Sequence, residues 1–374
     1  MTNRNRLFAV LDGEPADRVP IWLLFPYHPI GCYVNVRTHP SYRPVFEASK
    51  KYAIMLNRRN LPVSVHTPEV TRWQEDVVVD GRQATRTYVA YRGERIYSQT
   101  CPDDNGRYSK KLLDSAADLE FYCSLPVETD PGRITAELDR RLPGYLRDKD
   151  AFPGEYGAMM LALGEPVGKL YGISNLEEYA IWSLTHDGVI VDFLDRMMVQ
   201  YEMVYRYCLE RDLADVYFLV GSELASPPLV SRRTFQRWIV PYARRLIDLV
   251  HGSGRHVIQH YHGQIKEILP DFLTMGADGL HTIEAPPVGN CTHTEAYEIV
   301  GDRITLIGNI QYEDFRAFSP KEMAVAVRDT LDECTGKRFI ISPTAGPFDA
   351  HVPNEIIQNY IVFMETAWEY GKQF

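Results

Sequence analysis

This 374-residue sequence lacks the long apolar runs and paired cysteines that mark membrane-spanning or disulfide-rich proteins. No stretch approaches the roughly 20 apolar residues that a spanning helix needs, and the polar start of the chain does not form the apolar core of a signal peptide. The six cysteines are scattered without a C-x-x-C pair, which favours reduced thiols over a disulfide framework. We therefore expect a cytoplasmic protein.

Several catalytic signatures are missing as well. The sequence has no G-x-G-x-x-G, Walker-type, G-x-S-x-G or H-E-x-x-H motif, which argues against nucleotide-binding and serine-hydrolase functions. Forty Lys and Arg against 50 Asp and Glu give a formal charge of −10, which argues against nucleic acid or an anionic membrane as the main partner. The remaining class is a globular protein that acts on a small molecule.

Apolar runs alternate with amphipathic segments along the chain, most clearly after residue 216. Five runs in that part and three upstream have the length and composition of buried parallel strands. They lie at residues 19–25, 53–57, 157–163, 216–221, 256–260, 279–283, 304–308 and 339–342. Eight strands that alternate with helices predict a (β/α)₈ TIM barrel of the α/β class.

About 100 residues separate the second predicted strand from the third, so a segment is inserted there. Residues 77–82, 85–91 and 96–97 indicate a small antiparallel sheet, with tight turns at the glycines. Helical patterns follow near 115–122 and 130–141. We expect one domain over residues 1–374, with an antiparallel and helical insertion at about 62–150 between strands two and three.

Two histidines and a glutamate follow neighbouring predicted strands. His260 and His262 alternate at the end of one strand, so their side chains can share a face, and Glu284 ends the next strand. A barrel of this type carries its chemistry at the carboxyl ends of its strands, and two imidazoles with a carboxylate suit zinc or another divalent metal. The alternative is that both histidines are half-buried and hydrogen-bonded, while Glu284 caps the next helix. Spacing leaves both interpretations open.

Other polar residues follow the remaining predicted strands and are expected at the same mouth. Glu223 ends the fourth strand, and four roles are open for it: a hydrogen-bond acceptor for the substrate, a general base, a further metal ligand, or a loop carboxylate paired with an arginine. Asn309 follows the seventh strand and either orients a substrate or forms a turn. Tyr27 and His28 follow the first strand, and His351 follows the eighth.

Six motifs, taken in order, resemble the uroporphyrinogen decarboxylase superfamily. They are residues 17–22, 231–242, 260–263, 275–280, 308–310 and 342–346. The resemblance covers nearly the whole chain and is most extensive over 216–371. It implies a (β/α)₈ barrel. The superfamily includes the haem-pathway decarboxylase, corrinoid-dependent methyltransferases that act on thiols and, more distantly, cobalamin-independent methionine synthase.

The resemblance is weaker to the decarboxylase branch. That branch has an Arg-Gln-Ala-Gly-Arg stretch after strand one, where residues 25–31 of this chain contain no arginine. It also has a His-Gly pair after the last strand, where this chain has Ala345 and Gly346. A substrate with eight carboxylates needs concentrated positive charge, so both differences argue against uroporphyrinogen itself.

The methyltransferase branch implies a zinc site. It binds zinc through His-x-Cys on strand five and a Cys after strand eight, and the methionine synthase relatives add a Glu after strand six. On this resemblance His260 and Glu284 match ligands, and His262 stands at a Cys position. Ala345 replaces the last Cys, and His351, six residues on, is a candidate substitute.

The resemblance therefore favours an enzyme, a zinc-dependent methyltransferase that uses a corrinoid, carried by a corrinoid protein, or a methoxylated compound as methyl donor. Glu223 and Asn309 would contact the substrate or support the ligands. One alternative is a metal-free decarboxylase of uroporphyrinogen, another tetrapyrrole or a small carboxylate, in which Glu223, Tyr27 and His28 position the substrate. The other is a barrel that binds a tetrapyrrole or corrinoid without turnover. A homodimer is the expected assembly, because C₂ pairs are the commonest oligomers.

Overall fold

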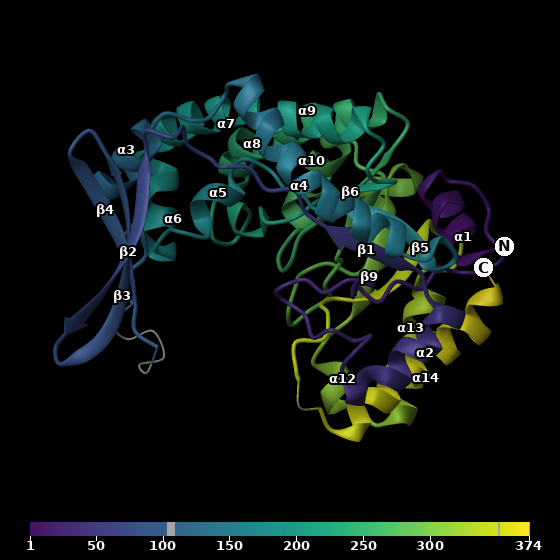
Figure 1. Ribbon diagram of the computed structural model, residues 1–374. Helices are drawn as coiled ribbons and strands as arrows, with labels where there is room; N and C mark the ends of the chain where they lie inside the picture. Colours follow the sequence, from purple (N-terminus) through teal and green to yellow (C-terminus); the bar gives the residue numbers. More distant parts are fainter. Residues whose placement is uncertain (103–108, 351, 374) are drawn as a thin grey trace.

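The computed structural model describes residues 1–102, 109–350 and 352–373, and the larger of the sheets in this part is curled and parallel (Figure 1). Its strand order is β1-β5-β6-β7-β8-β9-β10. These strands are β1 Met55–Arg59, β5 Gly157–Leu161, β6 Val216–Leu219, β7 His256–His260, β8 Gly279–His281, β9 Thr305–Ile310 and β10 Phe339–Pro343. The order follows the sequence, as in a TIM-like barrel.

The predicted first strand is not a regular strand. Its residues form two parallel bridges, Ile21 with Ile341 of β10 and Trp22 with Ile54 next to β1, which link the two edges of the curled sheet. Proline at position 20 has no N–H to donate, and Leu24 adopts a φ of 66°, which ends the extended conformation. The described part of the chain therefore has seven regular parallel strands instead of the eight that we predicted.

Helices cover the outer face of the curled sheet. They are α2 Arg43–Tyr52, α5 Gly168–Tyr171, α6 Leu176–Thr185, α7 Asp187–Glu210, α8 Arg232–Trp238, α9 Val240–His251, α10 Leu269–Met275, α11 His293–Val300, α12 Asp314–Ala317, α13 Pro320–Glu333 and α14 Asn354–Tyr370. Helix α1 Asn3–Leu11 instead packs against the inside of the barrel through Leu7, Val10 and Leu11. Helix α14 packs against both α2 and α13 (Figure 1). Among the described residues, no helix combines the length and apolarity that crossing a bilayer requires.

The alternation of side chains along each strand divides the core into two layers. Successive side chains of a strand point to opposite faces. One buried cluster contains Leu56, Met160, Phe218, Ile258, Ile307 and Ile340, which therefore share the inner face of the curled sheet. Their sequence neighbours belong to a second, larger cluster under the helices. This parity determines which side chains at the strand ends point into the barrel.

The insertion between β1 and β5 contains the predicted antiparallel sheet. Its strands are β2 Thr71–Val79, β3 Arg82–Tyr91 and β4 Glu94–Thr100, and the helices α3 Ala116–Ser124 and α4 Pro131–Ala151 follow. Both hairpins turn through two residues of positive φ, Asp80–Gly81 and Arg92–Gly93, which is the geometry of the tight turns that suit strand twist. The prediction of tight turns at the glycines is confirmed.

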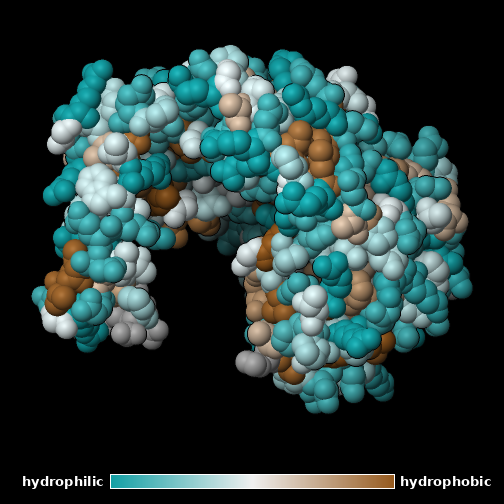
Figure 2. Space-filling model, in the orientation of Figure 1, coloured by the Kyte–Doolittle hydropathy of each residue, from teal (hydrophilic) through white to brown (hydrophobic). Residues whose placement is uncertain are grey.

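The antiparallel sheet stands apart from the barrel (Figure 1), and the space-filling view shows a deep hollow between them (Figure 2). Helices α5 and α12, which follow strands β5 and β9, lie on the side of the barrel that faces this sheet (Figure 1). The carboxyl ends of the parallel strands therefore open toward the hollow. We call this end of the barrel the mouth.

The start of β5 has no room for a side chain. A Cβ atom at Gly157 would lie 2.0 Å from the carbonyl oxygen of Met55, its partner in β1. We expect Gly157→Ala to destabilise the protein by about 2 kcal/mol or more, because the backbone of a central strand must shift. Urea denaturation followed by circular dichroism measures this change. The control is Gly188→Ala in α7, where a Cβ has open space and alanine favours the helix; equal effects at both sites would contradict the prediction.

Two buried histidines make the stability depend on pH. Burial lowers the pKa of His66 and that of His293 to about 4 each. The unfolded chain, whose histidine pKa is about 6.5, binds more protons between about pH 6.5 and pH 4, so stability falls as the pH falls through this window. We expect His293→Phe to reduce that slope by up to about 1.4 kcal/mol per pH unit. Denaturation curves at several pH values test this, and a slope equal to that of the wild type would refute it.

Candidate active site

Two histidines on adjacent strands stack inside the mouth. His260 has the parity of Ile258 in β7, so its ring points into the barrel, where it is only 8% exposed. His281 lies directly opposite it in the register of β7 and β8. The two ring centres are 4.8 Å apart and the planes differ by 10°. The parallel sheet itself therefore brings these imidazoles together.

Hydrogen bonds assign the tautomer of both rings. Nε2 of His281 lies 3.0 Å from the carbonyl oxygen of Pro343, which can only accept, so this nitrogen carries the proton. Burial lowers the pKa of His281 to about 3, so its Nδ1 bears a lone pair. Nδ1 of His260, 2.6 Å away, must then donate to it. Burial also lowers the pKa of His260 well below its usual value. Its Nε2 is consequently left unprotonated.

The free nitrogen of His260 faces a glutamate. Glu223 begins a short 3₁₀ segment, Glu223–Ala225, after β6, and its Oε1 lies 3.5 Å from Nε2 of His260. Burial raises the pKa of Glu223, and the Tyr171 side chain forms a hydrogen bond with it. Glu223 makes no ion pair with an arginine in the described part of the chain. It is therefore a group that can hold or release a proton beside an imidazole lone pair.

His262 and Glu284 form a second pair at the mouth. Nδ1 of His262 is 3.2 Å from Oε1 of Glu284, and the backbone N–H of Gly263 donates to Oε2 at 2.6 Å. Burial opposes charge on both groups, but their mutual interaction outweighs it and raises the pKa of His262 while lowering that of Glu284. The rings of His260 and His262 are 4.6 Å apart. Glu284 does not cap the next helix, because Thr292 caps α11.

Asn309 and Ala345 belong to the part of the wall formed by β9, β10 and the segment after β10. Asn309 is part of β9, and its amide donates to the carbonyl oxygen of Ile283 at 2.5 Å, which holds the backbone next to Glu284. Ala345 is partly exposed in the segment after β10, which packs on Tyr33. His351 lies outside the described residues.

Tyr27 and His28 are not brought to the histidines. Asn57 is buried on the outer face of β1, and its amide lies 3.0 Å from Nδ1 of His28. The ring of Tyr27 packs on Phe152 at 5.6 Å, near the end of α4. These contacts are behind the strand, away from the inner face on which His260 lies.

Sequence reasoning missed two residues of the inner face. In the sequence, His281 belongs to the predicted strand before Glu284. Because it alternates with Gly279, the strand pattern could have indicated that its side chain shares the face of Gly279. Arg58 has the parity of Leu56 and is paired in register with Met160, both of the inner cluster. We predicted the strand to end at residue 57, but β1 continues to Arg59.

The side chains at the mouth are of types that bind zinc, but they contact one another in pairs, His262 with Glu284 and His260 with Glu223. Two imidazoles and a carboxylate are common zinc ligands, and Nε2 of His260 has the lone pair that a ligand needs. Among the described residues, however, no three His, Cys, Asp or Glu side chains converge as a metal centre requires. A metal ion would have to replace the contact of His262 with Glu284 and that of His260 with Glu223.

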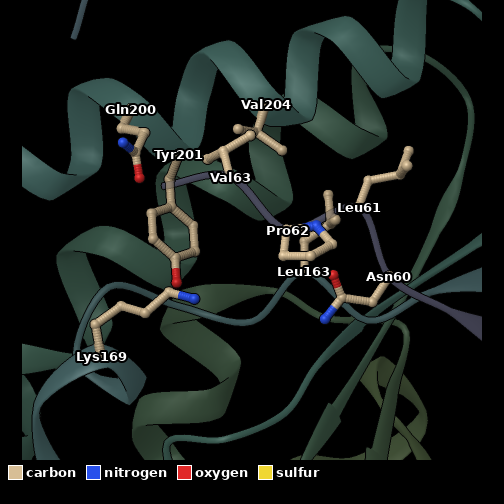
Figure 3. Close-up of a pocket in the computed structure, with 9 residues that line it drawn as sticks. All are labelled: Asn60, Leu61, Pro62, Val63, Leu163, Lys169, Gln200, Tyr201 and Val204. Atoms are coloured by element: carbon tan, nitrogen blue, oxygen red, sulfur yellow. The ribbon is translucent and has the colours of Figure 1, made fainter. Parts of the chain in front are cut away.

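A small cavity of about 40 Å³ lies between α7 and the segment after β1 (Figure 3). Lys169 and Tyr201 extend into it (Figure 3). Lys169 and Tyr171 belong to the same helix, α5, but only Tyr171 contacts Glu223. The cavity is therefore separate from the histidines.

Comparison with known proteins shows which sequences and structures this chain resembles. The profile of the family Uroporphyrinogen decarboxylase (URO-D) matches residues 175–370. Two sequences named methylcobamide:CoM methyltransferase MtaA, from Methanosarcina barkeri strain Fusaro and from Methanosarcina barkeri, are 28% and 24% identical to this chain over 190 residues. Each match covers 50% of this chain and 53% of the relative, so the chain spans about half the length of the curated relatives it matches.

A solved structure extends the similarity to the whole fold. The structure of a methyltransferase from Methanosarcina mazei is similar over 99% of both chains, with a TM-score of 0.60 and 17% sequence identity. At this identity the likeness supports the fold alone.

The tautomer of His260 can be measured directly. We expect long-range ¹H–¹⁵N spectra of histidine-labelled protein at neutral pH to show Nε2 of His260 unprotonated, because His281 accepts at Nδ1. His281→Phe should release this constraint and give a mixture of tautomers. His260→Gln assigns the signal, and a wild-type spectrum with a proton on Nε2 of His260 would contradict the hydrogen-bond assignment.

Proposed function

We propose, since this chain belongs to the uroporphyrinogen decarboxylase (URO-D) family, that it is a methyltransferase with a corrinoid or a methoxylated compound as methyl donor and a small nucleophile as acceptor. The observation that carries the proposal is the unprotonated Nε2 of His260, enclosed by Glu223 and by the His262–Glu284 pair. The names of the Methanosarcina barkeri relatives favour this branch of the family.

The chain's own residues can manage the proton of a thiol acceptor. The thiol must lose its proton before its sulfur attacks the methyl carbon. Burial raises the pKa of Glu223, which makes its carboxylate a better base than an exposed one and suits it to accept that proton. The carbon–sulfur bond forms as the bond to the donor breaks, and the electron pair of that bond leaves with the donor. Before this transfer, the fixed lone pair of His260 can accept a hydrogen bond from the S–H group and orient it.

Zinc is part of this proposal. His260, His262 and Glu284 would hold it, with Ala345 at the position of the branch's last Cys and His351 as the candidate fourth ligand. When bound, zinc lowers the pKa of a thiol and keeps the sulfur nucleophilic. With or without zinc, His281 supports the site, because it keeps Nε2 of His260 free of a proton.

The two alternatives receive less support from the residues present. A decarboxylase of uroporphyrinogen needs several cations for the carboxylates, and residues 25–31 supply none. A binder without turnover does not require a proton-accepting carboxylate next to an imidazole lone pair, the arrangement of Glu223 and His260.

The metal and the reaction can be tested together. We expect purified protein to contain about one equivalent of zinc, and His260→Ala to lose it. We also expect methyl transfer from methylcobalamin to a small thiol, with a loss of about 100-fold or more in the variant, because a ligand and orienting group is removed. Elemental analysis measures the zinc, and the absorbance change of the corrinoid follows the transfer.

The matched control is on the same strand. His256→Ala removes a histidine at the opposite end of β7, where Nε2 contacts Asp12 at 2.8 Å on the surface, and should leave metal content and rate unchanged. Fully active protein without metal would refute the zinc assignment. Release of carbon dioxide from a porphyrinogen, without methyl transfer, would refute the methyltransferase in favour of the decarboxylase.

A further inference from the structure

An arginine inside the mouth has no anionic partner. Arg58 lies on the inner face of β1 and is partly buried, and its guanidinium group makes no hydrogen bond or ion pair with any residue that the structure describes. Its neighbour Arg59, on the outer face, pairs with Asp148 at 2.5 Å and donates to the carbonyl oxygen of Pro29. The two adjacent guanidinium groups thus differ in having a partner, and the one without a partner points inward.

Arg58 lies close to the candidate active site. Its guanidinium carbon is 5.2 Å from the ring centre of Phe218, and the ring of His260 is 5.4 Å from the same centre. The positive charge of Arg58 acts on both His260 and Glu223. One small molecule can therefore touch the guanidinium at one end and these two side chains at the other.

The contact with Phe218 leaves the hydrogen-bonding edge of Arg58 free. A guanidinium over an aromatic ring interacts through its flat face, and its N–H groups project from the edge in a fork that matches a planar carboxylate. A partly buried cation without a partner costs free energy in the folded protein. Glu223, the carboxylate on which the charge of Arg58 acts, makes its contacts with His260 and Tyr171 instead.

We propose that Arg58 binds a carboxylate of the acceptor substrate and selects anionic acceptors over neutral ones. This inference rests on the proposed function, since it assigns the class of acceptor for that site. The acceptor is a small molecule with a nucleophile at one end, held between Glu223 and His260, and a carboxylate at the other, held by the fork of Arg58.

The test uses two thiols that differ in one charged group, 3-mercaptopropionate and 3-mercapto-1-propanol. Wild-type protein should bind the carboxylate about 10- to 100-fold more tightly, because hydrogen bonds to a charged group are worth this much. Arg58→Gln should remove the preference and leave binding of the alcohol unchanged. Calorimetry measures binding, and the KM for each thiol in the methyl-transfer assay measures it a second time.

Two further variants separate charge, geometry and folding. Arg59→Gln removes the adjacent arginine on the outer face and should keep the full preference. Arg58→Lys keeps the charge without the fork and should retain only part of it. Equal binding of both thiols by the wild type, or a preference that survives Arg58→Gln, overturns the inference.

The outcome also distinguishes this inference from the proposed function. Carboxylate binding that depends on Arg58, without any methyl transfer, supports the anion site and refutes the methyltransferase. Methyl transfer to both thiols with equal KM supports the methyltransferase and refutes the role of Arg58.

Discussion

The chain of hydrogen bonds from the carbonyl of Pro343 through His281 to His260 is the constraint on which the candidate site depends. A backbone carbonyl can only accept a hydrogen bond, so the carbonyl at the buried end determines which nitrogen donates and which accepts in each following hydrogen bond. The consequence appears at the other end, where an imidazole nitrogen faces Glu223 with its lone pair free. The carbonyl of Pro343 in the interior thereby determines which nitrogen of His260 is unprotonated at the mouth.

The same alternation that fills the barrel with apolar side chains also sorts the polar ones. Ile258 and His260 share the inner face of β7, as Leu56 and Arg58 share that of β1. Residues one position away, such as Asn57, belong to the outer layer, where Asn57 bonds His28. Neighbouring residues of one strand therefore differ in role: one points into the barrel, where it can contact a substrate, and the next packs in the outer layer.

Periodicity in the sequence was enough to predict most of the parallel strands, the antiparallel sheet, and the proximity of His262 to both Glu284 and His260. The predicted convergence of all three side chains on one point is not seen among the described residues, where they form pairs. It could not predict the state of the histidines, because that depends on the register of β7 against β8 and on a carbonyl 62 residues away from His281. The extent of β1 was also underestimated, which hid Arg58. Tyr27 and His28 were expected at the mouth from chain order alone, and a contact with Asn57, which sequence does not reveal, turns His28 outward.

The bridge from Ile21 to Ile341 joins segments that are far apart in the sequence, while the bridge from Trp22 to Ile54 links the first of these segments to the residue before β1. During synthesis Ile21 is made long before its partner Ile341 in β10. The hairpins of the antiparallel sheet need only near neighbours in sequence and can form early. The barrel wall therefore stays open until β10 has been made, and a shorter nascent chain leaves the edges of the parallel sheet unpaired.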